Sequence, residues 1–420
     1  HNGVLSFVFR SNGEISRVAM QVSSETCNYL HIDMWGLLQA TYAPAPVAGR
    51  DSVVAAYRHH RAERLPIRPM AQLALDHPGV NPAALQLGDP GARTVYGFVA
   101  NGIHYVSDCP TRHGEYPFCD VLDIPSYSVA KTLVAALASM RMELLYPGTM
   151  QQTVASHAPA PACLGTSWAD VHFSNLLDMS TGHYDSATYM ADEDAVKVQG
   201  FFYATGAAAK AHFSCAAYPR KTDPGTRWVY HTSDTYLLGM MLNATLRAQP
   251  GRAGHDIFRD VLVHDIFAPL ALSATAQTSM RTDDAAAQPL FGYGLTLHRD
   301  DFARLATFIG NQHGAIDGTQ RLDPGMLRAA KQQDPQARGL PVASLPEFRY
   351  QHGFWARNVQ PLLGCAHPTW VPFMSGYGGL SVVLFPNGSI YYNVADDGKL
   401  ASFDWGKVTA EARKLGDFCQ

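Results

Sequence analysis

A serine and a lysine three residues apart are the clearest candidates for chemistry in this chain. Ser128 and Lys131 come shortly after Pro125 and stand at the start of a long apolar segment. Residues three apart lie on the same face of a helix, so the hydroxyl and the amine would point into one space. The first turn of a helix has unpaired N–H groups and the positive end of the helix dipole, which favour a negatively charged oxygen. The pair predicts that Ser128 is a nucleophile that its substrate acylates, and that Lys131 helps to activate it.

The Ser-x-x-Lys spacing alone is weak evidence, because it also occurs by chance as an ordinary surface pair. Ser128 and Lys131 form the only such spacing in the chain, and their place before an apolar helix favours catalysis. The chemistry also needs a proton shuttle, a pair of N–H donors for an oxyanion and shelter from water. Candidates for the first two parts occur later in the sequence.

Tyr230 is the candidate proton shuttle. It lies in Trp228-Val-Tyr-His-Thr232, between turn residues and a helical segment. A free tyrosine has a pKa near 10, so it needs a nearby ammonium group such as that of Lys131 to act as a base. A packed aromatic side chain is the alternative interpretation, and the adjacent His231 is a competing base. A Ser/His/Asp arrangement is disfavoured because the chain has no G-x-S-x-G turn.

The glycine-rich stretch Ser375-Gly-Tyr-Gly-Gly379 is the candidate for binding the substrate backbone. Gly376 and Gly378 have no side chain and allow a ligand to approach the backbone closely. The N–H near Tyr377, together with that of Ser128, would complete an oxyanion hole. The alternative is an ordinary glycine-rich turn between two strands.

Composition excludes several classes of function. The chain has 420 residues, of which 47% are apolar and 16% charged, and its net charge is −4. No basic stripe favours nucleic acid, and no run of about 18 apolar residues could span a membrane. No H-E-x-x-H, P-loop or G-x-G-x-x-G motif occurs, so we expect no metal and no organic cofactor. The expected partner is a small-molecule substrate, and the oligomeric state is left open.

The cysteines favour an exported protein. Seven are present, and Cys109 and Cys119 bracket a turn-rich loop that a disulfide would close. Disulfides persist in oxidising compartments, so this pairing predicts a secreted or periplasmic protein. Seven buried thiols in a cytoplasmic enzyme are the alternative, and the odd count leaves at least one cysteine free or paired externally.

The order of elements indicates a sheet built from both ends of the chain. Strand patterns at 94–106 precede the Ser128 helix, a mostly helical block follows, and strand patterns return at 369–394. Asn101-Gly102 and Asn387-Gly388 each predict a hairpin turn between two of these strands. Strands around a helical insertion suit a mixed fold with a site between sheet and insertion. The predicted units are an N-terminal β-rich extension (1–60), an α/β catalytic domain (61–148 and 286–420) and a mostly helical lobe (149–285).

Several stretches, in order, resemble the serine β-lactamase and penicillin-binding superfamily. The S-x-x-K motif of that superfamily is present at Ser128, and the segments around Tyr230 and Tyr377 resemble its second and third motifs. Four further segments resemble the class C-like branch, which includes family VIII carboxylesterases and 6-aminohexanoate dimer hydrolase: 173–182, 266–272, 293–305 and 378–386. The resemblance covers roughly residues 65–415. It implies an α+β fold, with an antiparallel sheet flanked by helices and an all-α lobe.

The resemblance implies that Ser128 is the nucleophile, Lys131 its activator and Tyr230 the shuttle, with an oxyanion N–H near Tyr377. Two departures bear on the substrate. Thr232 stands where the family usually has Asn or Ser, and no Lys or His occurs at 374–379, where a cation holds a β-lactam or peptide carboxylate. A serine hydrolase acting on a carboxylic ester or small linear amide is therefore expected. The alternatives are a β-lactamase or DD-peptidase, and a non-catalytic penicillin-binding-like module.

Overall fold

A nine-stranded sheet organises the structure. The computed structural model describes residues 3–22, 34–43, 45–86, 92–111, 114–157, 159–395 and 397–419. The sheet is antiparallel except where its edge strand β4 pairs in parallel with β6. Its strands, in spatial order, are β13 (Leu340–Val342), β14 (Leu345–Gln351), β15 (Phe354–Asn358), β16 (Trp370–Gly376), β17 (Leu380–Leu384), β18 (Ile390–Ala395), β5 (Arg93–Ala100), β6 (Ile103–Val106) and β4 (Ile67–Pro69).

The centre of the sheet is buried on both faces, because alternate residues of a strand point to opposite sides. Val382 and Tyr392 belong to one core, which also contains α3 (Leu137–Leu145) and α8 (Arg299–Gly310). Val383 and Tyr391 belong to a second core with α11 (Trp405–Arg413). The sheet is thus a middle layer between two sets of helices, as the predicted α+β fold requires.

The two ends of the chain meet in the middle of this sheet. Strand β18 pairs with β5, so an early strand lies beside a late one. The predicted hairpins are confirmed: β5 and β6 flank Asn101 and Gly102, both of which have positive φ, and β17 and β18 flank Asn387-Gly388. Asn and Gly suit these tight turns because both tolerate a positive φ.

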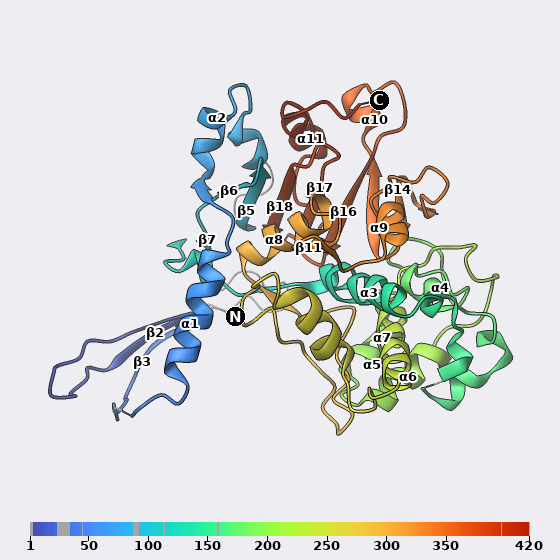
Figure 1. Ribbon diagram of the computed structural model, residues 1–420, viewed down its shortest axis with the longest axis horizontal. Coiled ribbons are helices and arrows are strands. Elements are labelled where there is room, and N and C mark those ends of the chain that lie inside the picture. The colour runs from blue at the N-terminus through green and yellow to red at the C-terminus, as the bar shows by residue number, and fades with distance from the viewer. Residues whose placement is uncertain are drawn as a thin grey trace.

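Residues 149–285 contribute no strand to the sheet within the part of the chain that is described. Their main helices form the lower right of Figure 1, with α3 between them and the sheet. The domain boundaries drawn from the sequence pattern stay a prediction. The lobe contains α4 (Phe173–Leu177), α5 (Gln199–Tyr203), α6 (Ala207–Ala216), α7 (Thr232–Arg247) and the π-helix η11 (Ile257–Phe267).

The N-terminal segment forms a separate small sheet. Its strands are β1 (Gly3–Ser6), β2 (Val18–Val22) and β3 (Met34–Leu38), and with α1 (Arg50–Ala62) they extend to the lower left of Figure 1. The strands agree with the predicted β-rich extension at 1–60, but most of α1 also lies in this range. Short helices α2 (Leu73–Asp76), α9 (Pro324–Ala330) and α10 (Gln360–Leu363) complete the fold. No helix among the described residues is long and apolar enough to cross a membrane.

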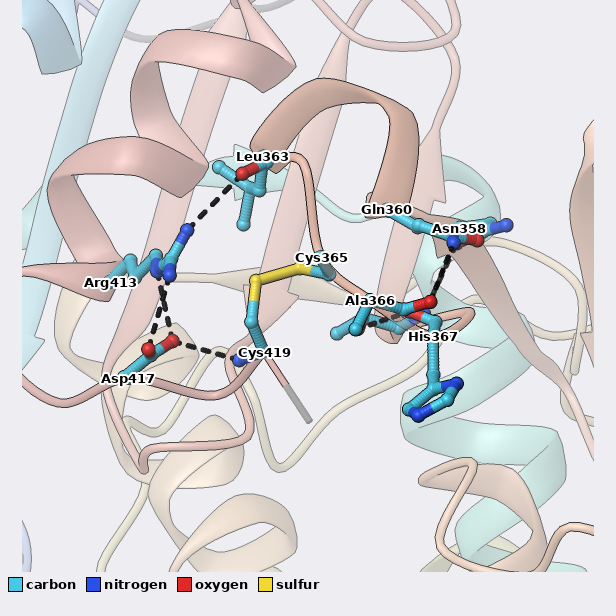
Figure 2. Close-up of a disulfide and its surroundings, with 10 residues drawn as sticks. Asn358, Gln360, Leu363, Cys365, Ala366, His367, Arg413, Asp417 and Cys419 are labelled. Atoms are coloured by element: carbon cyan, nitrogen blue, oxygen red, sulfur yellow. Dashed lines mark hydrogen bonds and ion pairs between the residues drawn. A yellow bond between two sulfur atoms is a disulfide. The ribbon is translucent and has the colours of Figure 1, made fainter.

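Three disulfides close loops in the described part of the chain. Cys109 pairs with Cys119, as the sequence predicted, and Cys163 pairs with Cys215. The third joins Cys365 to Cys419, 54 residues later, and so fastens the loop before β16 to the C-terminal end. Figure 2 shows the same connection supported by Arg413, which bonds to the Asp417 carboxylate and to the carbonyl oxygen of Leu363. The seventh cysteine, Cys27, lies outside the described residues.

Candidate active site

Ser128 is held at the junction of the sheet, the helical lobe and α3. The preceding strand β9 (Ile124–Pro125) pairs with β10 (Thr296–Leu297), and the Ser126 N–H donates to the Leu295 carbonyl oxygen at 2.8 Å. Tyr127, directly before the candidate nucleophile, has a φ of 43°. A left-handed backbone is uncommon for a bulky residue, and such conformations cluster at functional sites. The surrounding pairing therefore fixes the backbone that presents Ser128.

Lys131 lies within reach of Ser128, as its spacing predicted. A 3-10 turn, η4 (Tyr127–Val129), leads into a π-helix, η5 (Lys131–Ala136), and π-helical turns occur frequently at functional sites. The Lys131 Nζ is 2.9 Å from Ser128 Oγ, 2.8 Å from Thr232 Oγ1 and 3.2 Å from the Gly292 carbonyl oxygen. Burial lowers the pKa of Lys131 to about 8, although the nearby Glu193 carboxylate opposes that shift. A buried lysine with this pKa can act as a base near neutral pH.

Tyr230 completes the predicted group. Its phenol is hydrogen-bonded to the Ser128 side chain, and its ring lies 4.8 Å from Lys131 Nζ and stacks on Trp355. Burial raises the pKa of Tyr230 well above its ordinary value, and the Glu193 charge adds to the rise, while the bond to Ser128 lowers it in part. The phenol therefore stays protonated near neutral pH. This favours Lys131 as the proton acceptor and leaves Tyr230 to pass a proton on.

His231 faces away from this group, toward buried carboxylates. Its Nε2 is 3.0 Å from Asp192 Oδ2 and its Nδ1 is 3.8 Å from Asp234 Oδ2, while its ring stacks on Tyr218. Burial lowers the pKa of His231, but the bond to Asp192 and the neighbouring carboxylates raise it more, and the net shift is upward. Both ring nitrogens are directed at acids, so the geometry favours Tyr230 over His231 as the shuttle.

The sequence reasoning missed Glu193 and Gly292. The Glu193 carboxylate accepts hydrogen bonds from both the backbone N–H and the side-chain hydroxyl of Thr232. Gly292 supplies the carbonyl oxygen that accepts from Lys131. Neither residue belongs to a spacing pattern that includes Ser128. An acidic residue ahead of the tyrosine segment was the only signal for Glu193, and the chain has many such residues.

The glycine-rich stretch lies beside Ser128. A methyl group built on Gly376 would come within 2.8 Å of the Ser126 carbonyl oxygen, so only glycine allows this approach. Gly378 has a φ of 87° in the turn after β16. The Tyr377 ring packs edge-on against that of Tyr127, with their centroids 5.8 Å apart. The structure thus brings residues 376–378 next to the candidate nucleophile.

No lysine or histidine stands at 374–379. Met374 is buried in the core with 1% exposure, and the Ser375 hydroxyl donates to the Leu400 carbonyl oxygen at 2.9 Å. Within the residues the structure describes, no group of three or more His, Cys, Asp or Glu is placed to hold a metal ion.

Comparison with known proteins supports the fold. No protein-family model matches this sequence, and no curated protein matches it. Solved structures do resemble it. EstCE1, a hydrolase with promiscuous acyltransferase activity, matches with a TM-score of 0.55 at 16% identity, covering 87% of this chain and 99% of that one. A penicillin-binding protein homologue from Caulobacter crescentus matches with a TM-score of 0.53 at 17% identity, covering 86% and 95%.

The fold is that of the serine β-lactamase and penicillin-binding superfamily. A D-stereospecific amidohydrolase from Streptomyces has the same fold, with a TM-score of 0.53 at 16% identity over 81% of this chain and 97% of its own. The fold predicted from the resemblance is therefore confirmed. At these identities the likeness concerns the fold, and the chemistry is argued from the side chains of the site.

Proposed function

We propose that this protein is a serine hydrolase that cleaves a carboxylic ester or a small linear amide through an acyl-enzyme on Ser128. The observation that carries the proposal is the 2.9 Å contact between Ser128 Oγ and Lys131 Nζ, with the amine buried and its pKa lowered to about 8. A neutral amine at this distance can take the hydroxyl proton as the oxygen attacks.

Acylation begins when the Ser128 oxygen bonds to the carbonyl carbon and its proton passes to Lys131. The carbonyl electron pair moves to its oxygen, where the backbone N–H groups of Ser128 and Tyr377 stabilise the charge. The ammonium of Lys131 then returns a proton through the Tyr230 hydroxyl to the leaving oxygen or nitrogen, and the bond to that atom breaks. The phenol accepts one proton and gives up another, so it need not become a phenolate.

Deacylation uses the same groups in reverse. A water molecule attacks the acyl carbon, its proton passes to Tyr230 and Lys131, and the bond to Ser128 breaks to release the acid. The hydroxyl of Ser128 regains its proton. Gly376 and Gly378 leave room beside the backbone for the substrate, and Thr232 holds the lysine in place.

The lack of a cationic side chain at 374–379 favours a neutral substrate. A β-lactam or a peptide carboxylate would need a positive partner, but no Lys or His stands at 374–379. The structural likeness to EstCE1, a hydrolase, and to an amidohydrolase supports hydrolysis of this kind. The three disulfides also support a protein that works in an oxidising compartment, secreted or periplasmic.

The proposal is tested by turnover of p-nitrophenyl esters and of nitrocefin. We expect ester hydrolysis that is lost in Ser128→Ala, with little turnover of nitrocefin. Preferred turnover of nitrocefin would instead identify a β-lactamase. Equal ester hydrolysis by the wild type and Ser128→Ala would contradict the proposed nucleophile, and no turnover by the wild type would favour a non-catalytic module.

A further inference from the structure

Glu193 is an acidic side chain built into the site by a firmly held loop. The preceding residue, Asp192, accepts backbone N–H bonds from Asp185 and Ser186, both at 2.8 Å, and bonds to His231. This anchoring places Glu193 at the N-terminal end of α7, where its two carboxylate oxygens bond to the N–H and the hydroxyl of Thr232. The carboxylate therefore contacts the residue that in turn contacts Lys131.

These bonds fix the direction of the Thr232 hydroxyl. An ionised carboxylate only accepts hydrogen bonds, whereas a hydroxyl has a single hydrogen to donate. The Thr232 hydrogen is thus committed to Glu193, and its oxygen must act as an acceptor toward Lys131 at 2.8 Å.

The direction of the Thr232 hydroxyl determines which hydrogen bonds Lys131 can make. Two of its three partners, the Thr232 oxygen and the Gly292 carbonyl, can then only accept from Nζ. A neutral amine has two hydrogens and one lone pair. Both hydrogens are used by these acceptors, so the lone pair is left to face the third partner, Ser128.

We propose that Glu193 is a positioning residue for catalysis: by holding the Thr232 hydroxyl proton, it aims the lone pair of neutral Lys131 at the Ser128 hydroxyl. This inference rests on the proposed hydrolase function and adds a part to it. Glu193 acts through Thr232 and is not itself a base for the reaction.

The charge of Glu193 also matters to its neighbours. It opposes the effect of burial on Lys131 and so keeps the pKa of that amine from falling further. It adds to the upward pKa shifts of Tyr230, Tyr218 and Asp234, and it helps to raise that of His231. Removing the charge should therefore lower the pKa of Lys131.

The test is Glu193→Gln. The glutamine oxygen can still accept from the Thr232 N–H, so the helix end stays capped, but its NH₂ group donates to the Thr232 oxygen. The Thr232 hydrogen is then free to turn toward Lys131 and compete for its lone pair. We expect the plateau value of kcat/KM for a p-nitrophenyl ester to fall at least about tenfold. We also expect its ascending pH limb to move to lower pH.

Two further variants distinguish a positioning role of Glu193 from a purely structural one. Asp194→Asn removes the same charge one residue away, from an exposed side chain, and should change neither the plateau nor the limb. In a Thr232→Val background, Glu193→Gln should have no further effect on the plateau, because the hydroxyl through which it acts is gone. A fall in rate with an unmoved pH limb, or equal losses in both backgrounds, would overturn the proposal.

An NMR titration of Lys131 requires no enzyme activity, so it tests the role of Glu193 separately from the proposed hydrolase function. The ¹³C shifts of labelled lysines, with Lys131 assigned from a Lys131→Met sample, report its pKa in the wild type and in Glu193→Gln. We expect a lower pKa in the variant. An unchanged pKa would overturn the role of Glu193 whether or not the esters are hydrolysed, whereas a lowered pKa in a protein without ester turnover would reject the hydrolase alone.

Discussion

The pH dependence of ester hydrolysis follows from the burial of Lys131. The amine must be neutral to take the Ser128 proton, and its pKa is lowered to about 8. About one lysine in ten is then neutral at pH 7, and about nine in ten at pH 9. We therefore expect kcat/KM to rise about tenfold between these values and to level off above pH 9. The pKa of Tyr230 is raised well above 10.0, so its ionisation should add no falling limb in this range.

The assay is kcat/KM for a p-nitrophenyl ester from pH 6 to 10, with Ser128→Ala at each pH as the blank for spontaneous hydrolysis. A lysine at the ordinary value of 10.5 would give a rise of about a hundredfold from pH 7 to 9, still continuing at pH 10. That steeper profile, or a flat one, would refute the view that a buried, neutral Lys131 is the base.

Three further predictions concern the shuttle, the close approach and the third disulfide. Tyr230→Phe keeps the ring but should lower kcat by about 10² or more, and an unchanged rate would reject the shuttle. Gly376→Ala should destabilise the protein by about 1–3 kcal/mol in a thermal melt, and it should slow acylation in an ester assay. Gly254→Ala is the control, because a methyl there meets nothing within 4 Å, and it should change neither quantity. Replacing Cys365 and Cys419 by Ser should cost about 2–4 kcal/mol in denaturant unfolding with kcat unchanged, and an unaltered midpoint would contradict this.

Local sequence patterns predicted the central hairpins of the sheet and the contact between the two main site residues. Asn-Gly turns at 101–102 and 387–388 predicted two hairpins of the sheet, because few residues suit such turns. The spacing of Ser128 and Lys131 predicted their contact, since both lie in one helical segment. The local segment offered Tyr230 as a candidate shuttle beside His231, and the family resemblance favoured Tyr230, but spacing alone could not place a residue so far along the chain beside Ser128.

Contacts between distant segments could not be predicted in the same way. Glu193 reaches Lys131 through Thr232, and Gly292 offers only a backbone carbonyl, which any residue type would provide. The pairing of Cys163 with Cys215 depends on how the helical lobe folds, and the number of possible pairings rises steeply with the number of cysteines. The type of the helix was not predicted either: the structure has a π-helix at Lys131–Ala136, and all six of its residues are buried.

The choice between Tyr230 and His231 also could not be predicted from the local sequence. In the sequence it stands beside Tyr230 and is the stronger base of the two, since an ordinary histidine titrates near neutral pH. The structure turns its ring toward Asp192 and Asp234, while the less basic phenol faces Ser128. Adjacent residues in an extended segment point to opposite sides, so the choice depends on which side faces the nucleophile.

The most direct test of the account is to find which residue a fluorophosphonate probe modifies, by peptide mass spectrometry of the intact protein after labelling. A hydroxyl activated by a neutral lysine should react, so we predict one adduct, on Ser128, that is lost in Lys131→Met. An adduct on another serine, or equal labelling of Ser128 without the lysine, would contradict the claim that these two side chains form the catalytic pair.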